Sequence, residues 1–199
     1  MRKLLPVAVL SFFCSVANAQ ISNFTGFSLG GNIEFKAPTL KLAATGVEFE
    51  GLGSQNIIVS ASADYGVELS KSSVLLVGGK YDVQNTPVVK ITVGGEAVTI
   101  EEQGHYSLFV APGILLSDKT LGFVKLSYEN AKVGVAGLPE IGEQSVSGMG
   151  YGLGVRTNLG GNANLDVEVG RIVYDAKDIA TGKLTSGTTY GRVGFSFKF

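Results

Sequence analysis

The sequence predicts an all-β protein, an eight-stranded antiparallel up-and-down transmembrane β-barrel preceded by a cleaved signal peptide. Along eight segments, apolar and polar residues alternate with a period of two, as in strands that have one apolar face. Short and long connections alternate between these segments, as in membrane barrels with turns on one side and loops on the other. The chain is 45% hydrophobic. Beyond its N-terminus, however, it contains no apolar run of the roughly 18 residues that a membrane helix needs.

Residues 1–19 have the pattern of a secretory signal peptide. A positive start at Arg2 and Lys3 precedes a short apolar stretch, and Ala17-Asn18-Ala19 has the A-x-A form of a cleavage site. We therefore expect cleavage between Ala19 and Gln20, which leaves residues 20–199 as the barrel domain.

The composition excludes several kinds of site. The only cysteine, Cys14, is removed with the signal, so the mature chain has no disulfide, thiol nucleophile or cysteine metal ligand. The formal net charge is −1, and no basic cluster of the kind that binds nucleic acid is present. No carboxylates or histidines have metal-ligand spacing, and no glycine-rich stretch has the phosphate-loop pattern. We expect no metal, no other cofactor and no nucleic-acid partner.

The eight expected strands are long enough to cross a bilayer, which takes about 9–11 residues of tilted strand. They cover residues 24–36, 56–68, 74–81, 105–113, 121–128, 147–157, 165–174 and 188–199. Residues 37–55, 82–104, 129–146 and 175–187 form the long connections. In the second of these, Val88, Val89, Ile91 and Val93 either belong to a loop or extend two strands above the membrane. Arg171 has outward parity, so we expect it near the outer rim or next to a bulge.

Aromatic residues on the outward face are expected to form two belts, because amphipathic rings prefer the membrane interface. With both chain ends on the inner side, the outer belt contains Tyr81, Tyr106 and Tyr128. The inner belt contains Phe24, Phe27, Tyr65, Phe195, Phe197 and Phe199.

Charged residues of both signs have inward parity. The interior of an eight-stranded barrel is just wide enough for side chains to fill it, and buried charges must be paired. The pattern therefore predicts a plugged, salt-bridged lumen, in which the glycines at 148, 150, 152 and 154 leave room for a long arginine, Arg156. A narrow gated path for small solutes is the alternative. The predicted lumen residues are Glu34, Lys36, Asp64, Glu68, Lys80, Lys125, Arg156, Asp166, Glu168, Arg192 and Lys198.

The segment Val193–Phe199 alternates apolar and polar residues and ends on phenylalanine. It resembles the terminal strand that outer-membrane barrels present to their assembly machinery, with Phe195, Phe197 and Phe199 as the signal. Residues 106–128 and 150–169 resemble hairpins of the small outer membrane protein β-barrel domain family (OmpA/OmpX-like). The resemblance spans essentially the whole mature chain. It implies a location in the outer membrane of a Gram-negative bacterium, with outer-membrane lipid, lipopolysaccharide and the barrel assembly machinery as partners.

Three functions remain open. The first is a structural or porin-like barrel of the cell envelope, and the second is a surface barrel that binds a partner through its long loops. The third is a lipid A hydrolase, because His105 and Ser107 form an H-x-S pair similar to that of lipid A deacylase barrels. Leu108 stands where those enzymes usually have asparagine, and no acidic partner of His105 has matching spacing. We expect a monomer that is not an enzyme, with His105 at the rim next to a loop.

Overall fold

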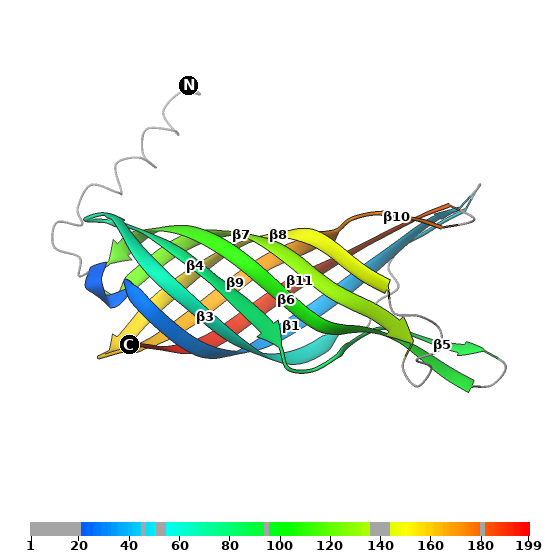
Figure 1. Ribbon diagram of the computed structural model, residues 1–199, viewed down its shortest axis with the longest axis horizontal. Helices are drawn as coiled ribbons and strands as arrows, with labels where there is room; N and C mark the ends of the chain where they lie inside the picture. Colours follow the sequence, from blue (N-terminus) through cyan, green and yellow to red (C-terminus); the bar gives the residue numbers. More distant parts are fainter. Residues whose placement is uncertain (1–20, 45–46, 51–54, 94–95, 136–143, 180–181) are drawn as a thin grey trace, which may run out of the picture.

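The described chain forms one closed antiparallel sheet in the computed structural model, which describes residues 21–44, 47–50, 55–93, 96–135, 144–179 and 182–199 (Figure 1). The predicted signal peptide, with its cleavage site between Ala19 and Gln20, lies outside these residues. The barrel wall consists of β1 (Gly26–Ala44), β3 (Asn56–Ser70), β4 (Ser73–Asp82), β6 (Glu96–Ser117), β7 (Thr120–Val135), β8 (Gln144–Gly160), β9 (Ala163–Tyr174) and β11 (Gly182–Lys198).

Each wall strand pairs with the next one, and β11 pairs with β1 as well as β9, which closes the sheet. The predicted eight-stranded up-and-down barrel is therefore confirmed. Three short strands, β2 (Val47–Glu50), β5 (Thr86–Val93) and β10 (Lys177–Ile179), add to this wall, and the short helix η2 (Ile21–Asn23) precedes β1. Within the parts of the chain that the structure describes, no helix is long and apolar enough to cross a membrane.

The two ends of the barrel differ in their connections. At one end, here the turn end, hairpins close at the pairs Ser70–Ser73, Ser117–Thr120 and Gly160–Ala163. Gly160 and Gly161 have φ angles of 116° and 59°, which glycine adopts without a steric penalty. The C-terminus lies at this end, whereas β5 and β10 lie at the opposite end, here the loop end (Figure 1). The predicted short turns are confirmed.

The strands run further at the loop end than the sequence predicted. β1 ends at Ala44 rather than residue 36, and β6 begins at Glu96 rather than 105. The β1–β11 register is continuous from Ser28–Lys198 to Ala44–Gly182, so backbone pairing continues past the region of apolar alternation. Only the lipid-covered part of the wall requires an apolar outer face. The alternation of apolar and polar residues therefore could not show where these strands end beyond the lipid. Residues 88, 89, 91 and 93 extend the sheet as part of β5.

Large apolar side chains cover the outside of the barrel on every side. A protein surrounded by water does not expose so continuous an apolar surface. The closed sheet pairs the backbone groups of the wall, as a strand structure in hydrocarbon requires. The exterior is therefore a lipid-facing surface. Its exposed residues include Leu29, Ile33, Val59, Val77, Leu108, Val110, Val124, Leu126, Leu153, Val169 and Val193.

The predicted aromatic belts are present with one exception. Tyr81, Tyr106 and Tyr128 are exposed on the loop-end half of the wall. The exposed ring of Phe27 lies opposite that of Tyr65 in the β1–β3 register near the turn end. The remaining members of this inner belt, all exposed, are Phe195, Phe197 and Phe199.

Phe24 is the exception, and its assignment to the inner belt is wrong. It precedes β1, so strand parity does not apply, and its side chain is 3% exposed within an apolar cluster. Its backbone passes so close to Gly66 that a Cβ there would lie 1.9 Å from the Phe24 carbonyl oxygen. Arg171, by contrast, is exposed on the outer face as predicted, and the β8–β9 register has no shift beside it.

Candidate functional site

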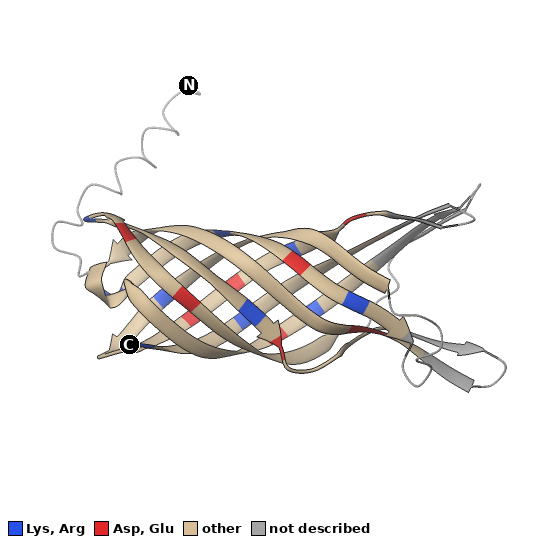
Figure 2. Cartoon of the chain, in the orientation of Figure 1, with Lys and Arg blue, Asp and Glu red and all other residues tan. Residues whose placement is uncertain are grey.

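Most of the charged residues with inward parity lie in the lumen. Acidic and basic residues are interspersed along the wall (Figure 2). Two of the predicted lumen residues do not join them, because they lie at the turn-end mouth. Glu68 is exposed, and the Nζ atom of Lys198 donates a hydrogen bond of 2.5 Å to the carbonyl oxygen of Ser22. The other nine are buried: Glu34, Lys36, Asp64, Lys80, Lys125, Arg156, Asp166, Glu168 and Arg192.

Arg156 on β8 joins two carboxylates from different parts of the wall. Its Nε atom donates to Asp166 Oδ1 at 2.6 Å, on the neighbouring strand β9. Its Nη1 and Nη2 atoms donate to the two carboxylate oxygens of Asp64 on β3, both at 2.8 Å. Because β3 is not a neighbour of β8, the guanidinium spans the lumen. Planar donor pairs of this kind match carboxylates in direction as well as charge.

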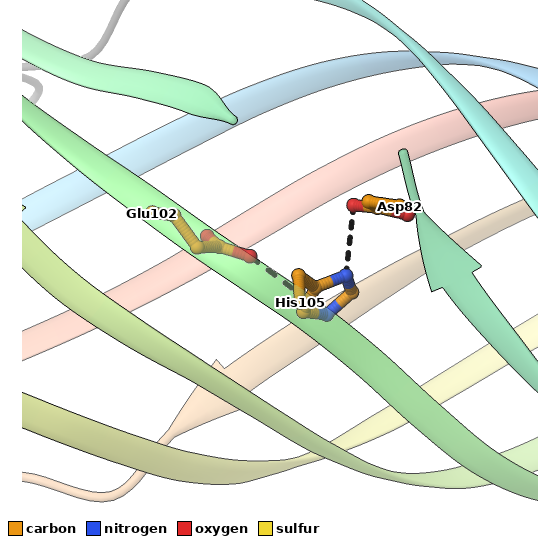
Figure 3. Close-up of side chains that lie close together, drawn as sticks. All are labelled: Asp82, Glu102 and His105. Carbon is orange, nitrogen blue, oxygen red and sulfur yellow. Dashed lines mark hydrogen bonds and ion pairs between the residues drawn. The ribbon is translucent and has the colours of Figure 1, made fainter. Parts of the chain in front are cut away.

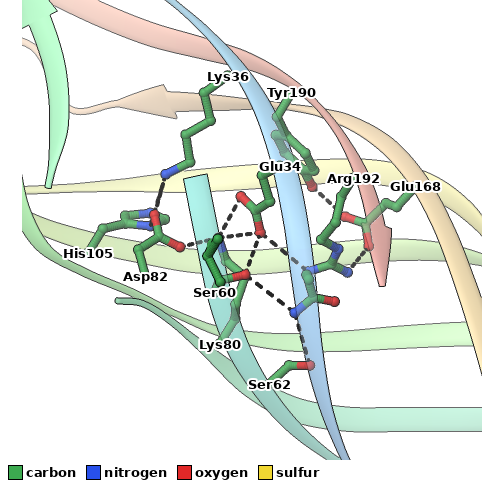
Figure 4. Close-up of polar contacts among 12 residues, drawn as sticks. Glu34, Lys36, Ser60, Ser62, Lys80, Asp82, His105, Glu168, Tyr190 and Arg192 are labelled. Carbon is green, nitrogen blue, oxygen red and sulfur yellow. Dashed lines mark hydrogen bonds and ion pairs between the residues drawn. The ribbon is translucent and has the colours of Figure 1, made fainter. Parts of the chain in front are cut away.

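A second group occupies the middle of the lumen. Glu168 forms ion pairs with Arg192 and Lys125, and the hydroxyl of Tyr190 donates to its Oε1 atom at 2.5 Å. Figure 4 shows Glu168, Arg192 and Tyr190 converging from two adjacent strands.

Glu34 connects this middle group to the next one, because its Oε1 atom lies 3.9 Å from Arg192 Nη1. Its carboxylate accepts from Lys80 Nζ at 2.8 Å and from Ser60 Oγ at 3.1 Å. Lys80 also contacts Asp82 Oδ1 at 2.9 Å (Figure 4). The wall thus carries one connected set of polar contacts from its centre toward the loop end.

At the loop end, three carboxylates surround the only histidine. His105 is 1% exposed, its Nδ1 atom lies 2.8 Å from Asp82 Oδ2, and its Nε2 atom lies 3.0 Å from Glu129 Oε2. The Nε2 atom is also 3.8 Å from Glu102 Oε1 (Figure 3). Lys36 forms an ion pair with Asp82 on the Nδ1 side of the ring. We call these five residues the His105 cluster.

Several members of this cluster were placed wrongly from the sequence. Glu102 was expected in the long connection of residues 82–104, yet it lies in β6 and is buried. His105 was expected at the rim without an acidic partner, yet carboxylates contact both ring nitrogens. The cause is a register shift in β6 between Gln103 and Tyr106, with Gly104 at a φ angle of 57°. This bulge turns both Glu102 and His105 inward although their numbers differ in parity.

Asp82 and Glu129 could have been found from the sequence. Each follows an inward residue by two positions, Lys80 on β4 and Ser127 on β7, and is buried in the same way. They were missed because the predicted strands ended one residue before each of them.

An apolar cluster fills part of the turn-end half of the lumen, and the sequence analysis did not predict it. Ile21 packs against it. The cluster consists of Phe24, Val74, Leu76, Phe109, Ala111, Leu115, Leu121 and Phe123.

The inward glycines of β8 make room for other side chains than Arg156. A Cβ on Gly150 would lie 2.4 Å from Ser127 Oγ, and one on Gly154 would lie 2.4 Å from Phe123 Cζ. A Cβ on Gly152 would lie 3.1 Å from the Tyr190 hydroxyl. The predicted role of these glycines is therefore corrected: Gly150 and Gly154 leave room for side chains of the neighbouring strand β7, and Gly152 leaves room for Tyr190 of β11.

The geometry does not support a lipid hydrolase. His105 and Ser107 are each 1% exposed and face the lumen, away from acyl chains outside the wall. The Ser107 hydroxyl has no hydrogen-bond partner among the described residues, so His105 is not positioned as its base.

Comparison with known proteins shows likeness at the level of structure. No protein-family model matches the chain, and no curated protein is similar to it in sequence. Neisserial surface protein A is 15% identical with a TM-score of 0.50, over 88% of this chain and 98% of that one. Outer membrane protein OprG from Pseudomonas aeruginosa is 10% identical with a TM-score of 0.51, over 92% and 99%. Together with the closed sheet and the lipid-facing exterior, these likenesses identify the fold as that of the small Gram-negative outer-membrane β-barrels, as the sequence predicts.

Proposed function

We propose that this protein is an integral barrel of the Gram-negative outer membrane with a structural role in the cell envelope, and that its lumen is plugged by its own side chains. The observation that carries the proposal is the filling of the lumen. Arg156 bridges it between β8 and β3, and an apolar cluster occupies the turn-end half beside that bridge. In an eight-stranded barrel such side chains leave no wide aqueous path.

The same proposal includes the route of the chain to the membrane. Residues 1–19 direct export and are removed before Gln20. The outward alternation of Phe195, Phe197 and Phe199 on β11 supports recognition by the barrel assembly machinery. The mature chain is then a monomer that contacts outer-membrane lipid and lipopolysaccharide through its apolar exterior and binds no nucleic acid.

Electrical recording tests the plugged lumen. The mature chain is refolded in detergent, its folding is checked by a heat-dependent shift on a gel, and it is inserted into a planar lipid bilayer. We expect a folded protein without conductance steps, while a general porin in the same bilayer gives them. Reproducible steps from the folded chain would overturn the plugged lumen and favour the porin-like alternative.

A second candidate function is partner binding at the loop end, and the edge strands favour it. β2 pairs with β1 alone and β5 with β6 in the described sheet, so each leaves one edge unpaired beyond the barrel wall (Figure 1). Unpaired edges accept an extended peptide as an additional strand.

Shortening the β5–β6 hairpin tests this candidate. Replacing residues 89–100 by an Asn-Gly turn, which favours two-residue hairpins, removes the projecting edge and keeps the barrel part of β6. Bacteria with the full chain are expected to adhere to immobilised host-matrix protein, and bacteria with the shortened chain are not. Equal adhesion by the two strains, with equal amounts of folded protein, would exclude the β5 edge as the binding surface.

A further inference from the structure

The His105 cluster fixes the hydrogen on one ring nitrogen. An ionised carboxylate only accepts hydrogen bonds, so the 2.8 Å contact between Asp82 Oδ2 and His105 Nδ1 requires the hydrogen on Nδ1. The Asp82 carboxylate also faces Lys36 and Lys80 and is fully engaged by these three groups. Asp82 therefore orients the histidine, and the Nε2 atom of the ring remains for another contact.

That Nε2 atom faces a second free acceptor. It lies 3.0 Å from Glu129 Oε2, and both atoms are buried without a hydrogen-bond partner among the described residues. Glu102 Oε1 lies 3.8 Å from the same nitrogen. Lone pairs that face each other at this distance in a buried site repel unless a cation lies between them. The cluster thus contains a position that calls for a proton or a metal ion.

Hydroxyl groups hold both acidic side chains at this position by hydrogen bonds. The hydroxyl of Ser127 donates to Glu129 Oε1 at 2.5 Å, which leaves Oε2 to face the histidine. The hydroxyl of Tyr174 donates to Glu102 Oε1, the oxygen that also faces His105, at 3.1 Å. Metal-binding sites in proteins characteristically have such outer hydrogen bonds, and a carboxylate on the far nitrogen of the ligating histidine is among the commonest.

The charge of the lumen distinguishes a metal ion from a proton. In the described part of the chain, seven buried carboxylates face five buried lysine and arginine side chains. A proton on His105 removes one of the two excess negative charges, whereas a divalent cation removes both. The excess is concentrated at the loop end, where Glu102 and Glu129 have no arginine partner among the described residues. Lys36 contacts Asp82 and, at 3.9 Å, Glu102 Oε1, and Lys80 contacts Asp82 and Glu34.

We propose that His105, Glu102 and Glu129 bind a divalent transition-metal ion of the zinc type, with Asp82, Ser127 and Tyr174 as positioning residues. One imidazole and two carboxylates suit zinc, whereas magnesium and calcium prefer oxygen ligands alone. The distances from His105 Nε2 to Glu129 Oε2, 3.0 Å, and to Glu102 Oε1, 3.8 Å, bracket the separation of two ligand atoms that each lie about 2.0–2.2 Å from one zinc ion. Sequence analysis did not predict this site, because its three ligands come from two strands, β6 and β7, and the inward direction of Glu102 depends on the Gly104 bulge.

Calorimetric titration of the refolded mature chain in detergent with Zn²⁺ tests the proposal. We expect one Zn²⁺ ion per chain and much weaker binding of Mg²⁺ at the same concentration. Ser127→Ala, which releases the Glu129 carboxylate, is expected to weaken Zn²⁺ binding about 10- to 100-fold. His105→Gln and Glu129→Gln, each of which removes a ligand, are expected to weaken it further.

Ser107→Ala is the matched control. Ser107 is as deeply buried as His105 and lies two residues away, yet its hydroxyl contacts no described polar group, so Zn²⁺ binding should be unchanged. The heat-dependent gel shift shows whether each variant folds. His105→Gln and Glu129→Gln are made as separate proteins, so that the test still works if only one of them folds. No Zn²⁺ binding by the folded wild-type chain, or equal binding by a folded ligand variant, would overturn the proposal and leave a proton between His105 and Glu129.

Discussion

Replacing Arg156 by leucine will lower the free energy of unfolding by about 3–5 kcal/mol, the usual cost of leaving a buried charge without its partner. The guanidinium makes four hydrogen bonds of 2.6–3.2 Å to Asp64 and Asp166, and all three side chains are buried. Leucine would leave two carboxylates facing the lumen with no cation between them. Urea unfolding of the chain in lipid vesicles measures the change.

Arg171 provides the matched control for this experiment. It lies on β9 like Asp166, but its side chain is exposed on the lipid-facing wall. An arginine on that face costs about 2–4 kcal/mol at the midplane and about 0–1 kcal/mol near the interface. Arg171→Leu should therefore leave stability unchanged or raise it slightly. A similar loss of unfolding free energy from Arg156→Leu and Arg171→Leu would mean that the ion pairs of Arg156 in the lumen do not cause the loss.

A rescue experiment separates the charge from the loss of packing. Adding Asp64→Asn and Asp166→Asn to Arg156→Leu removes the two carboxylates that the substitution left unpaired. Buried ion pairs replaced on both sides are often neutral in their effect on stability, whereas pairs broken on one side are costly. We expect the triple variant to regain part of the lost stability. A triple variant less stable than Arg156→Leu alone would contradict the electrostatic explanation.

The wall of the barrel was predictable because lipid imposes one simple rule on it. Each wall residue faces either hydrocarbon or lumen, so the alternation along β8, where Met149, Tyr151, Leu153 and Val155 face out, determines strand and orientation together. The short turns follow because antiparallel neighbours need only two residues to connect. Beyond the wall this rule ends, which is why β1 and β6 extend past their predicted limits.

The contacts inside the lumen were less predictable, because parity gives a direction but no partner. That Arg156 faces inward follows from alternation. Its bond to Asp64 depends on the curvature of the sheet, which brings β8 opposite β3 across the lumen. The inward direction of Glu102 could be predicted only with the knowledge that Gly104 adopts a positive φ angle. His105 lies beyond this bulge and follows the inward parity of the rest of β6. Local backbone irregularities of this kind decide which side chains meet.

Replacing Phe24 by alanine is expected to cost about 3–5 kcal/mol of unfolding free energy, the range for large aromatic side chains removed from a packed interior. Phe24 lies at the base of the apolar cluster with Val74, Leu76 and Leu121, all nearly inaccessible to solvent. Removing its ring leaves a cavity between the N-terminal segment and these side chains. The loss is measured by urea unfolding in vesicles.

Phe27→Ala, three residues further along the chain, distinguishes the lumen position from the belt position. Phe27 is exposed on the outer face and its ring lies 6.1 Å from that of Phe199. Aromatic pairs of this kind contribute about 0.5–1.5 kcal/mol, so its loss should be clearly smaller than that of Phe24. If Phe24 belonged to the inner belt, as its sequence position suggests, the two substitutions would have similar effects. Equal losses would therefore contradict the position of Phe24 in the apolar cluster.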